Sequence, residues 1–304
     1  MAAFTSWAGA TALAPAGQRA KLEYTIEIEG NAAASNASGE YQHWSTRRSL
    51  TVEATLVAQK ASVVDPGEPG GLHRASKPPA SAGFTPSEDM KALAAEMGKC
   101  GDDLGCRLRI AEKMKQNPRV QADMQKAQKA AETIRDSPPR YQLWIADFKE
   151  PVKGVARLDV KRDDFFRTAV DEHKTCTEVA EIPAAKAVGP GGFPANIRID
   201  AKDGTFVANV GGPAVIFLAK IDCTSTEGKR RYEEHSQTGI HLLPEKYTEG
   251  QAELEYFRGG ADAATGGRRL AHGSRELTGI YGTLMGGVPM TARVVVRWTV
   301  TLKD

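Results

Sequence analysis

The sequence lacks any long apolar run and any excess of charge of one sign. No stretch approaches the roughly 18 consecutive apolar residues that a membrane-spanning helix needs, so we expect no membrane span. The 40 Lys and Arg residues are balanced by 38 Asp and Glu residues, which leaves a net charge of +2. Nucleic-acid-binding proteins usually carry a strong basic excess, so this balance argues against a nucleic-acid partner.

Motifs for catalysis, metals and cofactors are missing as well. The chain contains no Walker-type loop, no G-x-S-x-G nucleophile elbow and no HExxH motif. Its six histidines are scattered, whereas a zinc site needs three or four ligands at definite spacings. We therefore predict no catalytic residue, no metal and no cofactor. Glycoside hydrolysis needs a pair of carboxylates, and nothing in the pattern selects two of the available acids, which are Glu178, Glu181, Glu233, Glu234 and Glu245.

Cysteine is scarce, with four residues in the chain. Cys100 and Cys106 lie close together among glycines, while Cys176 and Cys223 each lie in an extended segment. An even number of cysteines without a CxxC motif favours disulfides over a metal site, and locality favours the pairs 100–106 and 176–223. Four free thiols in a reducing compartment are the alternative. We expect two disulfides and a periplasmic or secreted protein.

The first 20 residues are small, mostly apolar and nearly uncharged. Ala12-Leu13-Ala14 resembles the end of a secretory signal, but a basic start and a strongly apolar middle are missing. We interpret residues 1–20 as a signal remnant or as an N-terminal arm of the mature chain. A retained arm could complete the sheet edge of a neighbouring molecule.

Period-two alternation of apolar and polar residues indicates strands at both ends of the chain. Residues 21–30 and 49–58 predict a long hairpin, and residues 292–303 alternate as cleanly. The first strand exposes glutamates and the last exposes arginines, so we expect these two strands to be neighbours. The sequence predicts a mainly β fold, an antiparallel β-sandwich or open barrel, formed by a discontinuous domain of residues 21–60 and 140–304.

Two shorter signals lie inside the second part of this domain. Asp203-Gly204 separates two extended patterns and predicts a tight hairpin. Residues 214–222 form a nearly continuous apolar run. Such a run predicts a strand that is covered on both faces.

The middle of the chain has a different character. Residues 61–86 are rich in Pro, Gly, Ser and Ala without any period, and predict a flexible linker. Helix starts follow at Thr85 or Ser87 and again near Asp103, so residues 87–136 predict a helical insertion pinned by a disulfide. An apolar stripe predicts that these helices pack on one another, with a partner-binding groove as the alternative. The stripe consists of Met90, Leu93, Met97, Leu104, Leu108 and Met114.

Basic clusters and aromatic residues are the weak ligand-binding signals. We interpret Arg47-Arg48, residues 229–231 and residues 268–269 as solvated loop charge. The sequon Asn36-Ala37-Ser38 lies in the first hairpin connection and matters only in a glycosylating host. The candidate ligand-binding residues, for a polysaccharide or a small ligand, are Trp44, Tyr232, Tyr247 and Tyr256.

These observations favour an exported, non-enzymatic β-rich protein that acts by binding or self-assembly, such as an extracellular structural subunit. The expected partner is a protein or a second copy of the chain. The alternative is a carbohydrate-active hydrolase or a glycan-binding module of the cell envelope.

Overall fold

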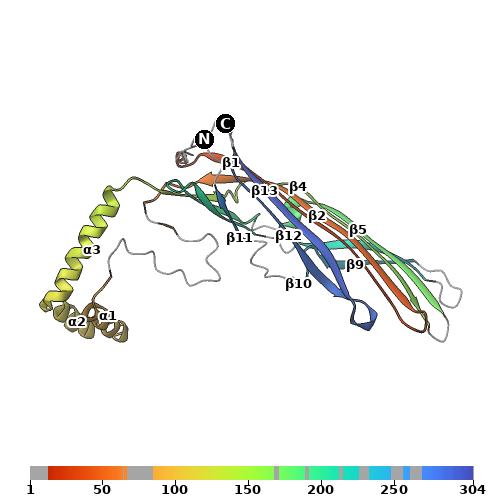
Figure 1. Ribbon diagram of the computed structural model, residues 1–304, viewed down its shortest axis with the longest axis horizontal. Helices are drawn as coiled ribbons and strands as arrows, with labels where there is room; N and C mark the ends of the chain where they lie inside the picture. The colour runs from red at the N-terminus through yellow and green to blue at the C-terminus, as the bar shows by residue number, and fades with distance from the viewer. Residues whose placement is uncertain are drawn as a thin grey trace, which may run out of the picture. The chain divides into compact units, whose positions relative to one another are not determined.

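The chain forms two compact units, one of residues 1–60 and 142–304 and the other of residues 61–141 (Figure 1). The computed structural model describes residues 13–63, 65–66, 85–167, 171–188, 192–211, 215–225, 233–247, 256–260 and 269–303. The first unit holds a large sheet and the second holds three helices. The predicted mainly β fold is confirmed. Most of the predicted linker and residues 1–12 of the predicted arm lie outside the described residues.

The sheet begins with the long hairpin that the alternation predicts, formed by β1 (Arg19–Ser35) and β2 (Tyr41–Ala58). The other strands are β3 (Tyr141–Ala146), β4 (Lys153–Phe166), β5 (Glu172–Pro183), β6 (Ala195–Asp200), β7 (Thr205–Val210), β8 (Ile216–Ser225), β9 (Glu233–His241), β10 (Lys246–Tyr247), β11 (Tyr256–Gly260), β12 (Arg269–Thr283) and β13 (Pro289–Leu302). A short helix, α4 (Ala184–Ala187), follows β5. A 3-10 turn, η2 (Met285–Gly287), joins β12 to β13.

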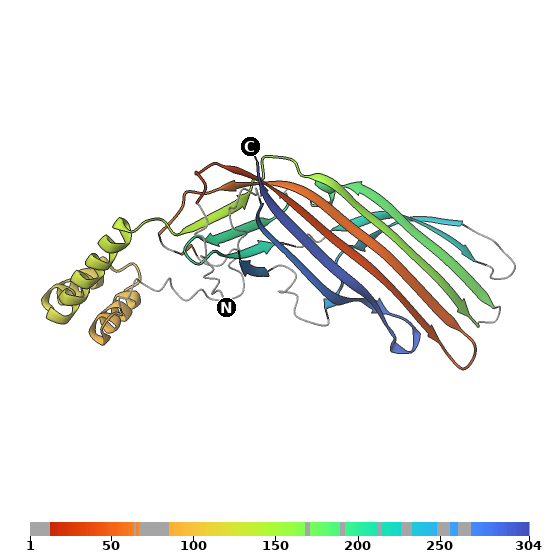
Figure 2. The ribbon, with the colours of Figure 1, turned by 45° about the horizontal axis from the view of Figure 1, so that its top comes forward.

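These strands form one curled sheet in which the long strands run side by side (Figure 1, Figure 2). The main order is β10-β12-β13-β1-β2-β4-β5-β8-β9. Strand β2 is long enough to pair with β4 over Tyr41–Glu53 and with β3 over Leu56–Ala58. From β3 the sheet continues through β6 and β7 to β11. The predicted Asp203-Gly204 hairpin is confirmed between β6 and β7, where Gly204 has φ +62°.

The first and last strands are neighbours, as their opposite charges predict. Strand β1 pairs antiparallel with β13 from Ala20 opposite Leu302 to Glu29 opposite Arg293. Alternate residues of a strand point to opposite faces. On β1 the inward set is fully covered, and it consists of Leu22, Tyr24, Ile26 and Ile28. This inner face forms the core, and the opposite face carries the charges.

The curl brings the two ends of the main strand order together. Strand β9 is the last in this order and β10 is the first, yet only residues 242–245 separate them along the chain. The Tyr281 hydroxyl of β12 donates to the Leu242 carbonyl at 3.1 Å, and the Glu245 amide donates to the Ile280 carbonyl at 3.0 Å. Because these contacts join β12 to the segment after β9, they hold the sheet in its curled form.

Both predicted disulfides are present. Cys176 and Cys223 lie directly opposite each other on β5 and β8, with their Cα atoms 4.1 Å apart. Cys100 and Cys106 are joined within the helical unit, with their Cα atoms 5.6 Å apart.

The prediction that residues 214–222 are covered on both faces is wrong. Phe217 and Ala219 of β8 are buried, but Leu218 between them is 66% exposed. Strand β8 belongs to the curled sheet, whose outer face has no described layer packed on β8. The near-continuous apolar run therefore reflects an apolar residue on the outer face, and not a second covering layer.

The helical unit consists of α1 (Glu88–Lys99), α2 (Leu104–Gln116) and α3 (Pro118–Asp136). The side chains of Ser87 and Asp103 accept the capping hydrogen bonds of α1 and α2. Asp123 of α3 accepts the Ser87 amide at 2.7 Å, and hydrogen bonds from the Ser87 side chain and from this amide lower the pKa of Asp123. The unit is thus held by polar contacts as well as by its disulfide.

The predicted packing stripe is wrong on α2. Leu104 is 69% exposed and Leu108 is 62% exposed, whereas Ile110 is buried. Cys106, Ile110 and Met114 recur at four-residue spacing and form the covered side of α2. Leu104 and Leu108 recur at the same spacing on the opposite side, so sequence periodicity alone did not show which of the two apolar sides is packed.

Candidate functional site

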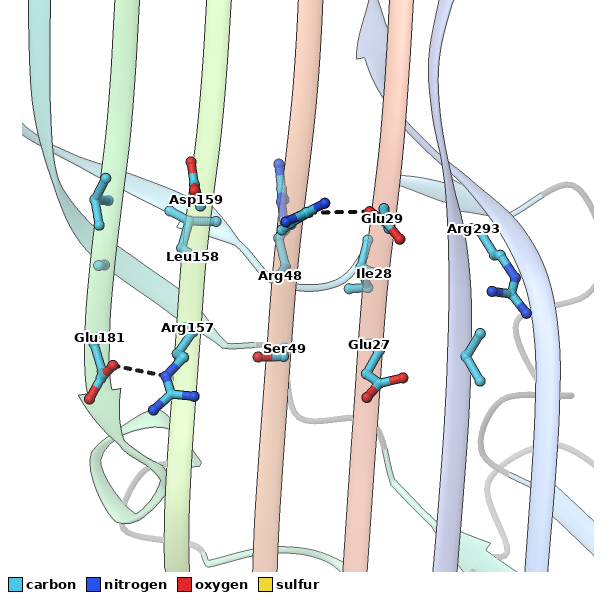
Figure 3. A pocket seen from close by; sticks show the side chains of 14 residues that line it. Glu27, Ile28, Glu29, Arg48, Ser49, Arg157, Leu158, Asp159, Glu181 and Arg293 are labelled. Carbon is cyan, nitrogen blue, oxygen red and sulfur yellow. Dashed lines mark hydrogen bonds and ion pairs between the residues drawn. The ribbon is translucent and has the colours of Figure 1, made fainter.

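The outer face of the sheet carries charged side chains in register across four strands (Figure 3). Arg293 of β13 lies opposite Glu29 of β1, and Glu29 lies opposite Arg47 of β2. Arg47 in turn lies opposite Asp159 of β4. Neighbouring strands are about 4.8 Å apart, so charges of alternating sign follow one another across this row.

Ion pairs join several charged side chains of this outer face. Arg157 Nε lies 2.8 Å from Glu181 Oε2, and a dashed line marks this ion pair in Figure 3. Arg47 Nε lies 3.2 Å from Glu29 Oε1. Each of these pairs is exposed, so each contributes only a few tenths of a kcal/mol to stability. Their main effect is to set the pattern of charge on this face.

One further pair lies at the border of this surface. Arg293 Nε donates to Glu276 Oε1 at 2.6 Å. This hydrogen bond lowers the pKa of Glu276 and raises the pKa of Arg293. Both groups therefore remain charged over a wide pH range.

A shallow hollow of ≈ 560 Å³ opens on this face. Ser49 of β2 lies at its centre in the strand register, opposite Glu27 on one side and Arg157 on the other. Its short side chain leaves space between longer neighbours. Val179 at one border is 52% exposed, so the hollow joins charged walls to an apolar edge.

The edge strand β9 is a second candidate surface. Over its nine residues it pairs with β8, from Glu233 opposite Thr224 to His241 opposite Ile216. Among the strands that the structure describes, β9 has no partner on its other side. The backbone groups of an edge strand can accept an added strand.

A buried charge on β2 lies on the inner face of the curled sheet. The prediction of loop charge at Arg47-Arg48 is wrong, because both residues lie in the middle of β2 and Arg48 is only 7% exposed. Its Nε donates to Thr46 Oγ1 at 2.9 Å, and its Nη1 donates to the His241 carbonyl. The guanidinium lies 4.3 Å from the centre of the Tyr281 ring.

Burial shifts the pKa values of Arg48 and Tyr281 in opposite directions. It lowers the pKa of Arg48 and raises the pKa of Tyr281, so the Tyr281 phenol keeps its proton and donates it to Leu242. Alternation could have identified Arg48, because it shares the inward parity of Thr46, Leu50 and Val52.

The predicted ligand-binding aromatics lie in different settings. Trp44 is buried on the inner face of β2, and its ring lies 6.2 Å from that of Tyr281. Tyr247 of β10 is half-buried. Tyr232 lies outside the described residues, and Tyr256 begins β11 without a described side chain.

Among the candidate acids whose side chains the structure describes, Glu178 and Glu181 do not form a pair. Glu178 is buried on the inner face of β5, with its Oε1 3.8 Å from Arg162 Nε, while Glu181 lies on the outer face against Arg157. Residues three positions apart on a strand point to opposite faces, so these two carboxylates cannot flank one bond. Glu245 is exposed, and the side chains of Glu233 and Glu234 are not described.

Within the described ranges, no three His, Cys, Asp or Glu side chains gather where they could hold a metal ion. None of the described helices combines the length and apolar character that a membrane-spanning helix requires. No family model, curated protein or solved structure matches this chain.

Proposed function

We propose that this chain is an exported binding protein that joins a second copy of itself by strand addition at β9. The observation that carries the proposal is the edge of β9, which pairs only with β8 among the described strands. An extended segment that aligns with such an edge gains main-chain hydrogen bonds, and side-chain contacts give the specificity. The two disulfides support an oxidising compartment.

Residues 1–12 of the second copy are the donor segment in this proposal. The Gln142 side chain accepts from the Ala14 amide and donates to the Ala14 carbonyl, each at 2.7 Å. Gly17 donates its amide to the Ala58 carbonyl at 2.9 Å. The chain is therefore anchored to its own sheet from Ala14 onward. Residues 1–12 precede this anchor and contain no charged side chain, which suits addition to a sheet edge.

Truncation tests the donor. We expect the full chain to form dimers or larger assemblies in a native-mass measurement, and the chain lacking residues 1–12 to be monomeric. This truncation leaves the Ala14 and Gly17 contacts intact, whereas removal of 1–20 would also delete the start of β1. A full chain that stays monomeric at all concentrations would contradict the proposal.

Proline substitutions test the acceptor edge. Adjacent strand residues direct their N–H groups to opposite sides, so one of Ser236→Pro and Gln237→Pro removes an edge donor and the other removes a donor to β8. The proline that removes only an edge N–H leaves the pairing with β8 intact, so this edge variant should have the same melting temperature as the chain lacking residues 1–12. We expect the edge variant to lose assembly. Undiminished assembly of that variant would exclude β9 as the acceptor.

A further inference from the structure

The turn between β1 and β2, at the end of the longest hairpin among the described strands (Figure 1), carries an N-x-S sequence. Asn36, Ala37 and Ser38 form the one N-x-S/T sequence in the chain. All three residues are exposed, and the strand pairing ends just before them, at Ser35 opposite Tyr41. The Asn36 amide donates to the Glu40 carbonyl at 3.0 Å and closes the turn.

Three donors converge on the side-chain oxygen of Asn36. The Ser38 hydroxyl lies 2.7 Å from Asn36 Oδ1, the Ser38 amide lies 3.1 Å away, and the Glu40 amide lies 3.0 Å away. Asn36 Nδ2 donates one proton to Glu40 Oε2 at 2.5 Å. All of these contacts join residues at most four positions apart, so the turn can form before the rest of the sheet.

We propose that Asn36 is an N-glycosylation site that accepts an oligosaccharide from a lipid-linked pyrophosphate donor. In the transfer, Nδ2 forms a bond to the anomeric carbon of the first sugar, the bond from that carbon to the pyrophosphate breaks, and Nδ2 releases one proton. Asn36 Nδ2 carries two protons before the transfer and one afterwards, so the glycosylated nitrogen can still donate a hydrogen bond to Glu40. The three hydrogen bonds to Oδ1 are unchanged, so the modified turn keeps its shape.

The position of the turn also accommodates a bulky group. Residues 36–39 are exposed, so an attached glycan extends into solvent without displacing core side chains. The proposal requires passage through an export compartment, which the disulfides also favour. It is independent of strand addition at β9, because neither Asn36 nor Ser38 takes part in that contact.

Secretion of the full chain from a cell that carries out N-glycosylation tests the site. We expect the intact mass to increase by one oligosaccharide, and enzymatic release of the glycan to convert Asn36 to Asp. Asn36→Gln and Ser38→Ala abolish the mass increase, while Ser38→Thr retains it. Asn31→Gln is the matched control, since Asn31 is an exposed asparagine of the same hairpin outside any sequon.

A secreted chain with both disulfides formed and Asn36 unmodified overturns the proposal. A glycan that persists in Ser38→Ala overturns it as well, because the sugar would then lie elsewhere. Ser38→Ala keeps the Asn36 side chain and its contacts with the Glu40 amide and carboxylate. A native disulfide pattern in this variant therefore separates loss of the acceptor from loss of the fold.

Discussion

At the scale of single residues, Arg48 shows how a buried charge can join distant strands. It lies on β2 in the middle of the sheet, yet it contacts the end of β9 and the Tyr281 ring of β12. A buried guanidinium that lost these partners would be left desolvated, and the partners would lose a donor.

We expect Arg48→Met to lower the free energy of unfolding by about 2–4 kcal/mol. Methionine keeps the apolar stem but removes the donors to Thr46 and His241. Urea unfolding followed by tryptophan fluorescence measures the loss. The adjacent Arg47→Met is the matched control, because that side chain is 79% exposed, and it should change stability by less than about 0.5 kcal/mol. Equal effects at both positions would contradict the role of burial.

Near the other end of the hairpin, Glu150 joins several strand ends. It accepts hydrogen bonds from the Thr55 hydroxyl and from Arg19. The Thr55 hydroxyl contributes most to lowering the pKa of Glu150 below its usual value of 4.5, and Arg19 adds to the effect.

This shift predicts acid sensitivity. A carboxylate whose pKa is lowered in the folded state stabilises the fold fully above its unfolded pKa, and this contribution is lost as the pH falls through the folded pKa. We therefore expect Glu150→Gln to be less stable than the natural chain at pH 7. The difference between the two should shrink as the pH falls below about 4.5. Urea unfolding at several pH values measures it, and a difference that is constant with pH would exclude ionised Glu150 as the cause.

At the scale of elements, the packing of β12 on β13 depends on a missing side chain. A Cβ at Gly273 would lie 2.5 Å from Trp298 Nε1 and 2.9 Å from Phe257 Cδ1. The Trp298 ring is buried and meets Phe206 and Phe257 edge to face. Neither the Trp298 ring nor the Phe257 ring can move aside without disturbing the packing of the core.

We expect Gly273→Ala to cost about 1–3 kcal/mol through overpacking. Thermal unfolding followed by tryptophan fluorescence checks this, since Trp44, Trp144 and Trp298 all lie in the sheet unit. Gly98→Ala is the control of opposite sign, and the helical circular dichroism signal follows its unfolding, because no tryptophan lies in residues 61–141. A Cβ at Gly98 of α1 meets nothing within 4 Å, and alanine should stabilise the helix by about 0.5–1 kcal/mol. An unchanged melting temperature for Gly273→Ala would contradict the close approach.

At the scale of the whole molecule, the two disulfides act on different units. Cys176–Cys223 closes a loop with a sequence separation of 47 inside the sheet unit, and Cys100–Cys106 closes one of 6 inside the helical unit. On the chain-entropy model these bonds contribute about 4 and about 2 kcal/mol.

We expect the double variant Cys176→Ala with Cys223→Ala to lower sheet stability by about 4 kcal/mol. Unfolding followed by tryptophan fluorescence reports this loss, because no tryptophan lies in residues 61–141. The control, Cys100→Ala with Cys106→Ala, should leave the fluorescence transition unchanged and weaken the helical circular dichroism signal. A control that shifts the fluorescence transition would show that the two units unfold together.

The sequence alone determined what depends on local patterns. Period-two alternation identified β1, β2 and β13, opposite charges identified β1 and β13 as neighbours, and locality identified both disulfides. Each of these signals depends on neighbouring residues or on one pair of segments, so the sequence is enough to recognise it.

Only the tertiary structure decided which apolar residues are covered and how the sheet curls. Leu108 and Leu218 lie in apolar patterns yet remain exposed, because no described element packs on them. Arg48 shares the inward parity of its strand, but the partners that it meets there, the His241 carbonyl and the Tyr281 ring, are about 190 and 230 positions away in the chain. Contacts over such separations depend on the whole curl, and local patterning carries no information about them.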